Sequence, residues 1–369
     1  MDSGARNAAP LWLTGVDPDD DSYVPLEVLA RRLGRPAHAI VRLDGDENPY
    51  GPSLRVLEVL GAAESLHRPP DPEARDCRAA LEPHTGVPRE RITVGAGLTE
   101  LLARILRLVA PAGTTVVVTP PTRAVYATLA AATGHEVVAV PRLPDFSLDL
   151  PRLEEVLART EMGALIASSP NDPTGTATPP NDIVRLLHQG TPVIVDESYV
   201  EYAERSGAPL TGEFPNLIIV RDCGPWAGLG GLPIGYTITD RALADRLRAA
   251  GRLTAPNQAA QLALLASLDD REALLSRVRQ LCYERGRLFR QLRKLNLVDP
   301  ILGEAPFLLC AVRRSSAGRI AGLLADDGIV IRPYSTPPLA NHLRIAAGRP
   351  DDTDRVYQAL LRLAERVVI

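Results

Sequence analysis

The sequence contains little lysine and little cysteine, and it has no long apolar run. Of its 41 Lys and Arg residues a single one, Lys294, is lysine, so any mechanism that needs a lysine amine has one candidate. The four cysteines, Cys77, Cys223, Cys282 and Cys310, are widely spaced without a CxxC or histidine pairing, which is typical of buried thiols in a cytosolic protein. No apolar run approaches the roughly 20 residues that span a bilayer. The first residues lack the pattern of a signal peptide.

The 369 residues carry a net charge of −4, with 45% hydrophobic and 23% charged residues. An ordinary apolar fraction with nearly balanced charge excludes a disordered chain. The absence of a net basic face argues against a nucleic-acid partner. Such a length buries one large core, or a large domain with a smaller one beside it. We therefore expect a cytoplasmic protein with no membrane partner, and we expect no metal site.

From about residue 90, short β-branched runs alternate with amphipathic helical stretches such as 98–110 and 150–160. The predicted strands are continuous apolar runs, as expected for strands covered on both faces. They lie at 114–119, 136–141, 163–170, 192–198, 216–222 and 233–239. Strands that alternate with helices predict an α/β fold with a mostly parallel sheet. Such sheets bind ligands beyond the carboxyl ends of their strands.

After about residue 255 the pattern changes. A long helix is predicted near 270–296, followed by short strands, a helix near 316–326 and a closing helix at 351–367. We therefore expect a large α/β domain at 39–260. The segments 1–38 and 261–369 would together form a small α+β domain.

The segments that follow the strands carry recognisable motifs. These are LDGDENPYGPS (43–53), GAGLTELL (95–102), PPTRAVY (120–126), SPNDPTG (169–175), VDESYVEY (195–202), GLGGLPIGY (228–236) and HLRIAAG (342–348). In this order they resemble the histidinol-phosphate aminotransferase family, within the fold-type I aminotransferases that depend on pyridoxal phosphate (PLP). The resemblance implies a large domain with a mostly parallel sheet, a small α+β domain, and a homodimer with its cofactor site at the subunit interface.

Several positions keep the residues that the family uses. Asp196 matches the aspartate that pairs with the pyridinium nitrogen and makes the ring an electron sink, and Tyr199 matches the tyrosine that reaches the cofactor's phenolic oxygen. Arg344 matches the arginine that binds the substrate carboxylate, a task suited to a planar two-pronged donor. Simple packing at a strand end is the structural alternative for Asp196.

Other matches are less specific. The Gly-rich turn at Gly97, Leu98 and Thr99 leads into a helix whose free N–H groups and dipole favour an anion. The resemblance places Tyr23 and the Asn48–Tyr50 stretch, including Tyr50, on the substrate side. Loop packing explains these residues equally well.

The segment 221–236 aligns with the family's lysine-containing loop without a gap. The lysine that forms the Schiff base falls on Pro225, the preceding serine on Gly224, and an upstream hydroxyl residue on Asp222. The phosphate-binding arginine falls on Pro233. Proline has no nucleophilic nitrogen and no N–H to donate. The resemblance therefore implies a missing catalytic lysine, and Lys294 lies on the predicted long helix, far from this loop.

Three further family positions are changed. The ring-stacking aromatic residue falls on Arg123, the asparagine of the Asn-Pro-Thr-Gly motif on Asp172, and the partner subunit's phosphate-binding tyrosine on Pro69. Each lost charge-assisted contact is typically worth about 1.5–3 kcal/mol. We therefore expect no cofactor in this cleft, with PLP disfavoured, and we expect that the chain is not an ordinary PLP-dependent transaminase.

The altered cleft offers a guanidinium at Arg123 and carboxylates at Asp172, Asp196 and Asp222. We expect Arg123 to pair with Asp172 or Asp196, because an unpaired buried charge is costly. Clustered carboxylates raise one another's pKa, which is how acid–base pairs arise. The alternative is that these charges only neutralise one another in an emptied pocket.

Three functions follow. The first is a PLP-independent enzyme that binds a carboxylate or amino-acid-like small molecule through Arg344, with Arg123, Asp172, Asp196 and Tyr199 as catalytic acid–base residues. The second is a non-catalytic binding protein or partner subunit of an active aminotransferase. The third is a lysine-less enzyme that uses PLP or its pyridoxamine form (PMP), or an aminotransferase of the histidinol-phosphate type. The sequence favours an enzyme and leaves the choice open.

Overall fold

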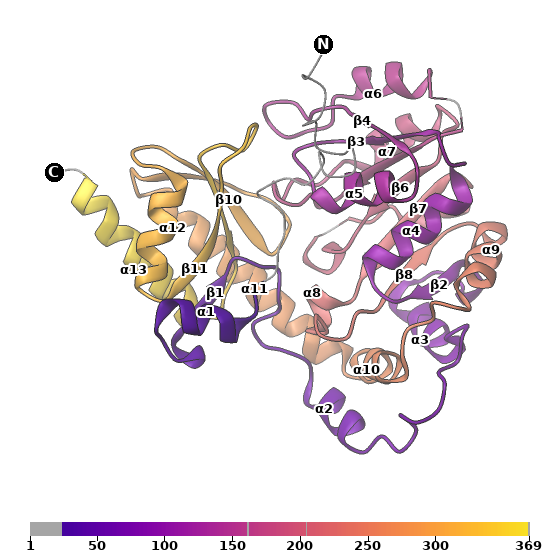
Figure 1. The fold of residues 1–369 in the computed structure, drawn as a ribbon, viewed down its shortest axis with the longest axis horizontal. Helices are drawn as coiled ribbons and strands as arrows, with labels where there is room; N and C mark the ends of the chain where they lie inside the picture. Colours follow the sequence, from indigo (N-terminus) through magenta and orange to yellow (C-terminus); the bar gives the residue numbers. More distant parts are fainter. Residues whose placement is uncertain (1–23, 161, 204, 368–369) are drawn as a thin grey trace, which may run out of the picture.

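The computed structural model describes residues 24–160, 162–203 and 205–367. The chain forms a seven-stranded sheet and a five-stranded sheet, each covered by helices (Figure 1). The larger sheet has the order β2 (Ile92–Gly95), β8 (Gly235–Ile238), β7 (Leu217–Asp222), β6 (Val193–Asp196), β5 (Ala164–Ser168), β3 (Thr115–Val118) and β4 (Glu136–Ala139). All neighbours pair in parallel except β8, which is antiparallel to β2 and to β7. The predicted α/β fold is confirmed.

Apolar residues cover both faces of the central strands. Along β3, Val116 and Val118 face one core while Val117 between them faces the other, because successive side chains of a strand point to opposite faces. The same alternation holds for Leu217 and Ile218 on β7. A continuous apolar run is therefore what a doubly covered parallel strand requires.

The strand β4 departs from this expectation. Its Glu136, Val137 and Ala139 are exposed, although the sequence predicted a strand covered on both faces. The strand lies at the edge of the sheet and pairs only with β3. An apolar run alone does not distinguish an edge strand from a central one.

The smaller sheet has the order β1 (Val41–Leu43), β11 (Ile329–Tyr334), β12 (His342–Ala346), β10 (Phe307–Val312) and β9 (Val298–Ile301). The strand β1 pairs in parallel with β11, and the other neighbours are antiparallel. Because β1 belongs to this sheet, the chain enters the larger unit only after Leu43, a few residues beyond the expected boundary at 38/39. The rest of the predicted domain division remains a prediction.

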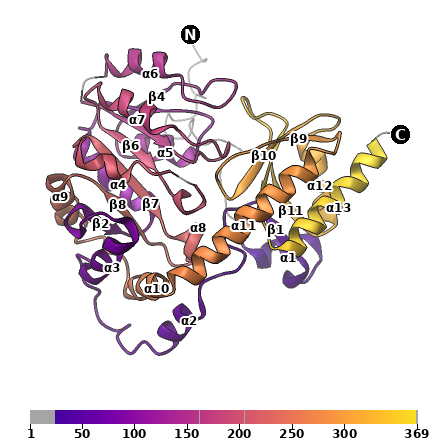
Figure 2. The ribbon, with the colours of Figure 1, turned by 180° about the vertical axis from the view of Figure 1, so that it is seen from behind.

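Thirteen α-helices lie in the described residues. They are α1 (Leu26–Leu33), α2 (Leu54–Gly61), α3 (Arg75–Thr85), α4 (Leu98–Val109), α5 (Ala124–Ala132), α6 (Leu150–Leu157), α7 (Pro180–Leu187), α8 (Gly224–Ala227), α9 (Arg241–Gly251), α10 (Gln258–Asp269), α11 (Arg271–Leu292), α12 (Ala317–Asp326) and α13 (Pro350–Val367). Short 3-10 turns lie at Ala37–Ala39, Arg89–Arg91, Val200–Tyr202 and Ala208–Gly212. Figure 2 shows α11 running from beside α8 and α10 to the smaller sheet.

Helix ends follow the local sequence. Asp240 and Asn257 accept backbone N–H groups in the first turns of α9 and α10, as N-cap residues do. The N-cap residue of α4 is Gly97, which has no side chain to cap the first turn, and Glu100 within that turn accepts a hydrogen bond from the Ala96 N–H at 3.2 Å. No helix among the described residues is long and apolar enough to cross a membrane. Within the same residues, no group of three or more His, Cys, Asp or Glu side chains is arranged to hold a metal ion.

Candidate functional site

Two cavities border the ends of the parallel strands, where open α/β sheets bind ligands. The larger has a volume of about 810 Å³ and lies between the start of α4, the end of β7 and the segment after β1. The smaller has a volume of about 130 Å³ and lies between the segments that follow β3 and β5 and the end of β11. Arg123, which immediately precedes α5, lines both cavities.

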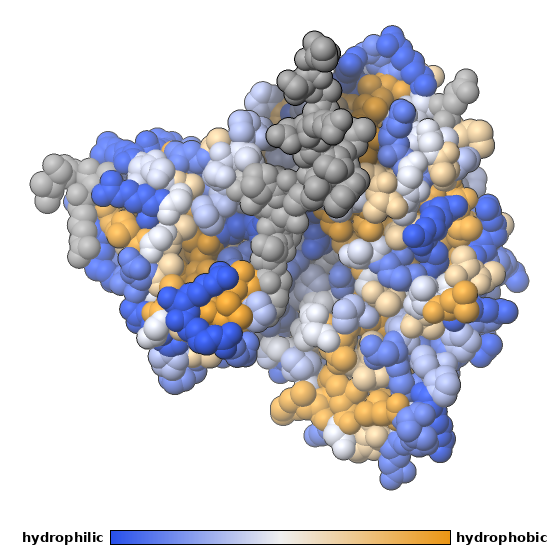
Figure 3. All heavy atoms as spheres, in the orientation of Figure 1, coloured by the Kyte–Doolittle hydropathy of each residue, from blue (hydrophilic) through white to orange (hydrophobic). Residues whose placement is uncertain are grey.

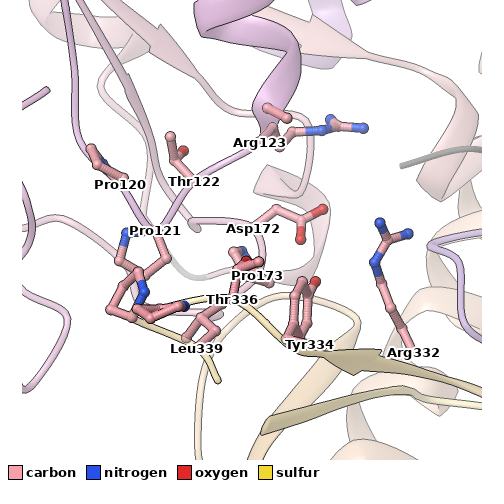
Figure 4. Close-up of a pocket in the computed structure, with 13 residues that line it drawn as sticks. Pro120, Pro121, Thr122, Arg123, Asp172, Pro173, Arg332, Tyr334, Thr336 and Leu339 are labelled. Carbon is pink, nitrogen blue, oxygen red and sulfur yellow. The ribbon is translucent and has the colours of Figure 1, made fainter. Parts of the chain in front are cut away.

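The four residues predicted as catalytic lie in one cluster. Figure 4 shows Asp172 in the smaller cavity, between the side chains of Arg123 and Arg332, with Tyr334 below it. Asp196 lies at the end of β6, and Tyr199 follows it closely in the chain. Their catalytic role stays a proposal.

Both carboxylate oxygens of Asp196 are engaged within the chain. Oδ1 accepts hydrogen bonds from the backbone N–H and the hydroxyl of Ser198, and Oδ2 accepts one from the hydroxyl of Tyr126 at 2.6 Å. Arg123 Nη1 lies 3.8 Å from the same Oδ2. Because Asp196 is 2% exposed, these hydrogen bonds and Arg123, and not water, stabilise its carboxylate.

Arg123 makes only long ion-pair contacts. Its terminal nitrogens lie 3.8 Å from carboxylate oxygens of Asp46 and Asp196, and its Nε has no hydrogen-bond partner among the described residues. The prediction that Arg123 pairs with Asp172 or Asp196 is therefore confirmed for Asp196. The pairing with Asp46 was missed. The sequence around Asp46 does not predict a contact with Arg123, because the two residues are far apart in the chain and meet only in the folded protein.

Asp172 pairs with Arg344. Arg344 Nη1 donates to Asp172 Oδ1 at 2.6 Å, and both side chains are about 95% buried, with 4% and 5% exposed. Burial by itself raises the pKa of Asp172, but the charges of Arg344 and Arg123 outweigh burial and hold that pKa below its usual value. Arg344 was predicted to bind the carboxylate of a substrate. In the structure it binds the carboxylate of Asp172 instead.

Tyr199 lies between two carboxylates. Its hydroxyl is 2.8 Å from Asp172 Oδ2 and 2.7 Å from Asp46 Oδ2. Burial, followed by the charges of Asp172 and Asp46, raises the pKa of Tyr199 well above its usual value, so the hydroxyl stays protonated. Because a tyrosine has one hydrogen to donate, the two carboxylates share it. The hydroxyl was expected to face a cofactor, and it faces these aspartates.

Of the residues expected on the substrate side, Asn48 lines a cavity and Tyr50 does not. Asn48 lines the larger cavity, where its side chain donates to the Trp226 carbonyl and accepts from the Tyr50 N–H. Tyr50 packs under the guanidinium of Arg349, 5.5 Å from its ring centre, and does not line either cavity. Tyr23 lies outside the described residues.

The Gly-rich turn lies at the larger cavity. Gly97, Leu98 and Thr99 line it, and the first backbone N–H groups of α4 have no side-chain cap. Gly97 has a φ of 85°, and a Cβ there would lie 3.2 Å from Pro233. The turn therefore suits glycine, and its N–H groups and helix dipole favour an anion.

The opposite wall holds the altered loop, with Asp222, Gly224, Pro225 and Pro233 all lining the larger cavity. Asp222 accepts a hydrogen bond from the Gly224 N–H at 2.9 Å, and burial raises the pKa of Asp222 to about 6. Pro225 lies in α8, and its carbonyl accepts from the Tyr202 hydroxyl at 2.7 Å. None of these four side chains carries an amine.

Lys294 follows the end of α11 and lines a separate cavity beside that helix. No lysine therefore lines either site cavity, since Lys294 is the one lysine of the chain.

The chain matches the family model of class I and II aminotransferases over residues 40–360. It is 40% identical to histidinol-phosphate aminotransferase of Roseiflexus castenholzii over 349 residues, which cover 92% of this chain and 94% of that protein. The chain belongs to the class I and II aminotransferase family. The chloroplastic histidinol-phosphate aminotransferase of Nicotiana tabacum is 36% identical over 339 residues, 91% of this chain and 82% of that protein.

Solved structures share the fold of this chain. Histidinol-phosphate aminotransferase from Sinorhizobium meliloti, in complex with pyridoxal-5'-phosphate, superposes with a TM-score of 0.84 and 26% identity over 99% of both chains. Aspartate aminotransferase from Thermus thermophilus with maleate has a TM-score of 0.76 at 20% identity, covers 98% of this chain and 99% of its own, and shows the shared fold. The predicted fold-type I architecture is confirmed.

The expectation of a cleft without a cofactor is wrong. The family and its PLP-bound relative point to PLP and not to an absent cofactor. The expectation gave weight to lost side chains, whereas the anion-binding turn at Gly97, Leu98 and Thr99 uses backbone N–H groups that those substitutions leave in place.

The residues present fit a phosphate-bearing ring that is held without a covalent bond. The uncapped first turn of α4 suits the phosphate, and the cavity of about 810 Å³ has room for the ring. The described cavity residues do not fit covalent attachment, because none of them carries a primary amine.

Proposed function

We propose that this member of the aminotransferase family binds a vitamin B6 phosphate, PLP or PMP, non-covalently in the larger cavity and acts there on a small amine or amino-acid-like substrate. The observation that carries the proposal is the uncapped start of α4 at a large cavity that no lysine lines. The relatives named histidinol-phosphate aminotransferase favour an aminotransferase reaction. The free cysteines fit a reducing cytoplasm.

The chain's own groups have defined tasks in this proposal. The first N–H groups of α4 and the Thr99 hydroxyl would hold the phosphate. When bound, the cofactor supplies an electron sink. Tyr199 and the carboxylates of Asp46 and Asp172 would hold and share protons at the edge of the cleft.

Titration of the purified chain with PLP tests the proposal. We expect saturable binding that gel filtration reverses, without the visible band of a lysine-bound cofactor, and no added mass after borohydride reduction. Thr99→Val should weaken binding by about tenfold, as the loss of a hydrogen bond to a charged group predicts. The control Thr128→Val, on the exposed face of α5, should bind like the wild type.

Two results would contradict the proposal. A reduced adduct on Lys294 would show that the single lysine reaches the cofactor after all. Absence of any PLP or PMP binding would favour a second candidate, a non-catalytic subunit that pairs with an active aminotransferase. The engagement of Arg344, Asp196 and Tyr199 by the chain's own side chains supports that candidate. Native mass spectrometry of the complex would identify the partner.

We also propose a homodimer. Leu54 and Leu57 on α2, and Leu66 just beyond it, are more than half exposed, and Figure 3 shows apolar side chains gathered over this lower part of the molecule. Contiguous apolar surface on a folded protein marks an interface.

Leu57→Asp should shift the sedimentation of the purified chain from dimer to monomer, and Leu323→Asp, an equally simple change on α12, should not. Identical sedimentation of wild type and Leu57→Asp would exclude α2 from the interface.

A further inference from the structure

Both terminal nitrogens of the Arg344 guanidinium are engaged inside the protein. Nη1 donates to Asp172 Oδ1 at 2.6 Å, Nη2 donates to the Asp44 carbonyl at 2.7 Å, and the group lies over the Phe307 ring, 4.9 Å from its centre. These contacts join the loop after β5 in the larger sheet to β12 in the smaller one. The side chain of Arg344 is 4% exposed.

The smaller cavity meets the carboxylate and not the guanidinium. Asp172 lines this cavity, together with Arg123 and Tyr334, whereas Arg344 is not part of its wall. Asp172 is also fixed from its other oxygen by the Tyr199 hydroxyl at 2.8 Å. A ligand in the cavity therefore meets Asp172 before it can reach Arg344.

An outside carboxylate could bind Arg344 only by displacing Asp172. Displacement would leave the Asp172 charge buried without its cation, and a buried carboxylate without a partner is strongly unfavourable. In the paired state, the charges of Arg344 and Arg123 hold the pKa of Asp172 down despite burial, so the carboxylate that occupies Arg344 is ionised. The pair is thus closed to competing anions.

Building on the proposed function, we propose that Asp172 is a specificity-determining residue that occupies Arg344 in place of a ligand carboxylate. Arg344 is then not available to the carboxylate or phosphate of a substrate. An anionic group of a substrate in this cleft would instead meet Arg123 or Arg332, which line the same cavity as Asp172.

Rescue by a small carboxylate tests this assignment. Asp172→Ala vacates the space beside Arg344, and formate is the probe because it supplies one carboxylate with almost no further volume. We expect formate to bind the variant at least about tenfold more tightly than the wild type, as the charge-assisted contact predicts. Calorimetry and the formate dependence of the thermal midpoint measure this effect. The double variant Asp172→Ala/Arg344→Leu should lose it.

If Asp172→Ala folds only when formate is present, the formate dependence of its folding yield supports the assignment directly. Saturable formate binding by the wild type at the affinity of Asp172→Ala would overturn it. Equal rescue of the double variant would also overturn it. The measurements need no cofactor, so a failure of PLP binding in the same preparations counts against the proposed function and leaves this assignment intact.

Discussion

Replacing Arg221 by methionine is expected to lower the free energy of unfolding by about 3–5 kcal/mol, because the change leaves Glu197 as an unpaired buried charge. Arg221 Nη2 lies 2.8 Å from Glu197 Oε2, and the two side chains are 7% and 2% exposed. Arg221 precedes Asp222 on β7, and Glu197 follows Asp196 at the end of β6. The pair therefore supports the two strand ends that carry site carboxylates.

The chain offers a matched control for this change. Arg185 Nη2 lies 2.7 Å from Glu154 Oε2, but these side chains are 51% and 28% exposed. Arg185→Met should therefore cost only about 0–1 kcal/mol, as exposed ion pairs usually do. Urea unfolding of both variants and of the wild type measures the difference.

A double variant separates the unpaired charge from other effects of losing Arg221. Arg221→Met/Glu197→Gln removes the charge but keeps an acceptor for the Gly207 N–H. It should recover much of the lost stability, because an unpaired buried charge accounts for most of the cost. Equal, small losses for Arg221→Met and Arg185→Met would show that burial does not govern these pairs.

The strands and the positions of the motifs could be predicted from the sequence. Doubly covered parallel strands need continuous apolar runs, and the runs at 163–170, 192–198 and 216–222 contain β5, β6 and β7. Because parallel strands end at one edge, the residues that follow them had to meet there. The sequence therefore predicts that Asp172, Asp196 and Asp222 lie at the same edge of the sheet.

The pairing inside the cluster could not be predicted in the same way. Arg344 reaches Asp172 because the register of β12 in the smaller sheet carries Arg344 across to the larger one. That relation depends on how two sheets pack, and no local pattern encodes it. The contacts of Asp46 with Arg123 and Tyr199 arise from the same packing.

The cofactor expectation failed for a different reason. The expectation considered side chains alone, so each substituted family position, from Arg123 to Pro233, counted as a lost contact with the cofactor. The identity of a side chain gives no information about the backbone groups of the turn. The N–H groups that begin α4 after Gly97 favour an anion whichever side chains are substituted around them.

Replacing Asp222 by asparagine is expected to stabilise the protein at pH 8 by up to about 3 kcal/mol, from a pKa difference of roughly two units at 1.36 kcal/mol each. The pKa of Asp222 is raised from 3.8 to about 6, mainly by burial; the Gly224 N–H and the charge of Arg123 oppose this rise, and the charges of Asp46 and Asp196 add to it. The asparagine carbonyl keeps the hydrogen bond from Gly224 and has no charge to desolvate.

The pH dependence follows from proton binding. Between pH 3.8 and about 6 the folded protein holds a proton on Asp222 that the unfolded chain releases, so this group's contribution to stability falls as pH rises through that window. Above pH 6 the loss is complete. The difference between Asp222→Asn and the wild type should therefore be near zero below pH 4, grow between pH 4 and 6, and stay constant above.

Denaturant unfolding at a series of pH values, with the variant and the wild type side by side, measures this difference and cancels the titration of all other groups. Asp269→Asn, at an exposed position of α10, should show no such rise. A variant that is less stable than the wild type at pH 8 would show that Arg123 more than compensates the ionised Asp222. In that case the carboxylate of Asp222 would be paired when a phosphate binds at the start of α4. If Asp222 is instead unpaired, it becomes protonated as the pH falls toward 6, and phosphate binding becomes tighter because the repelling charge is lost.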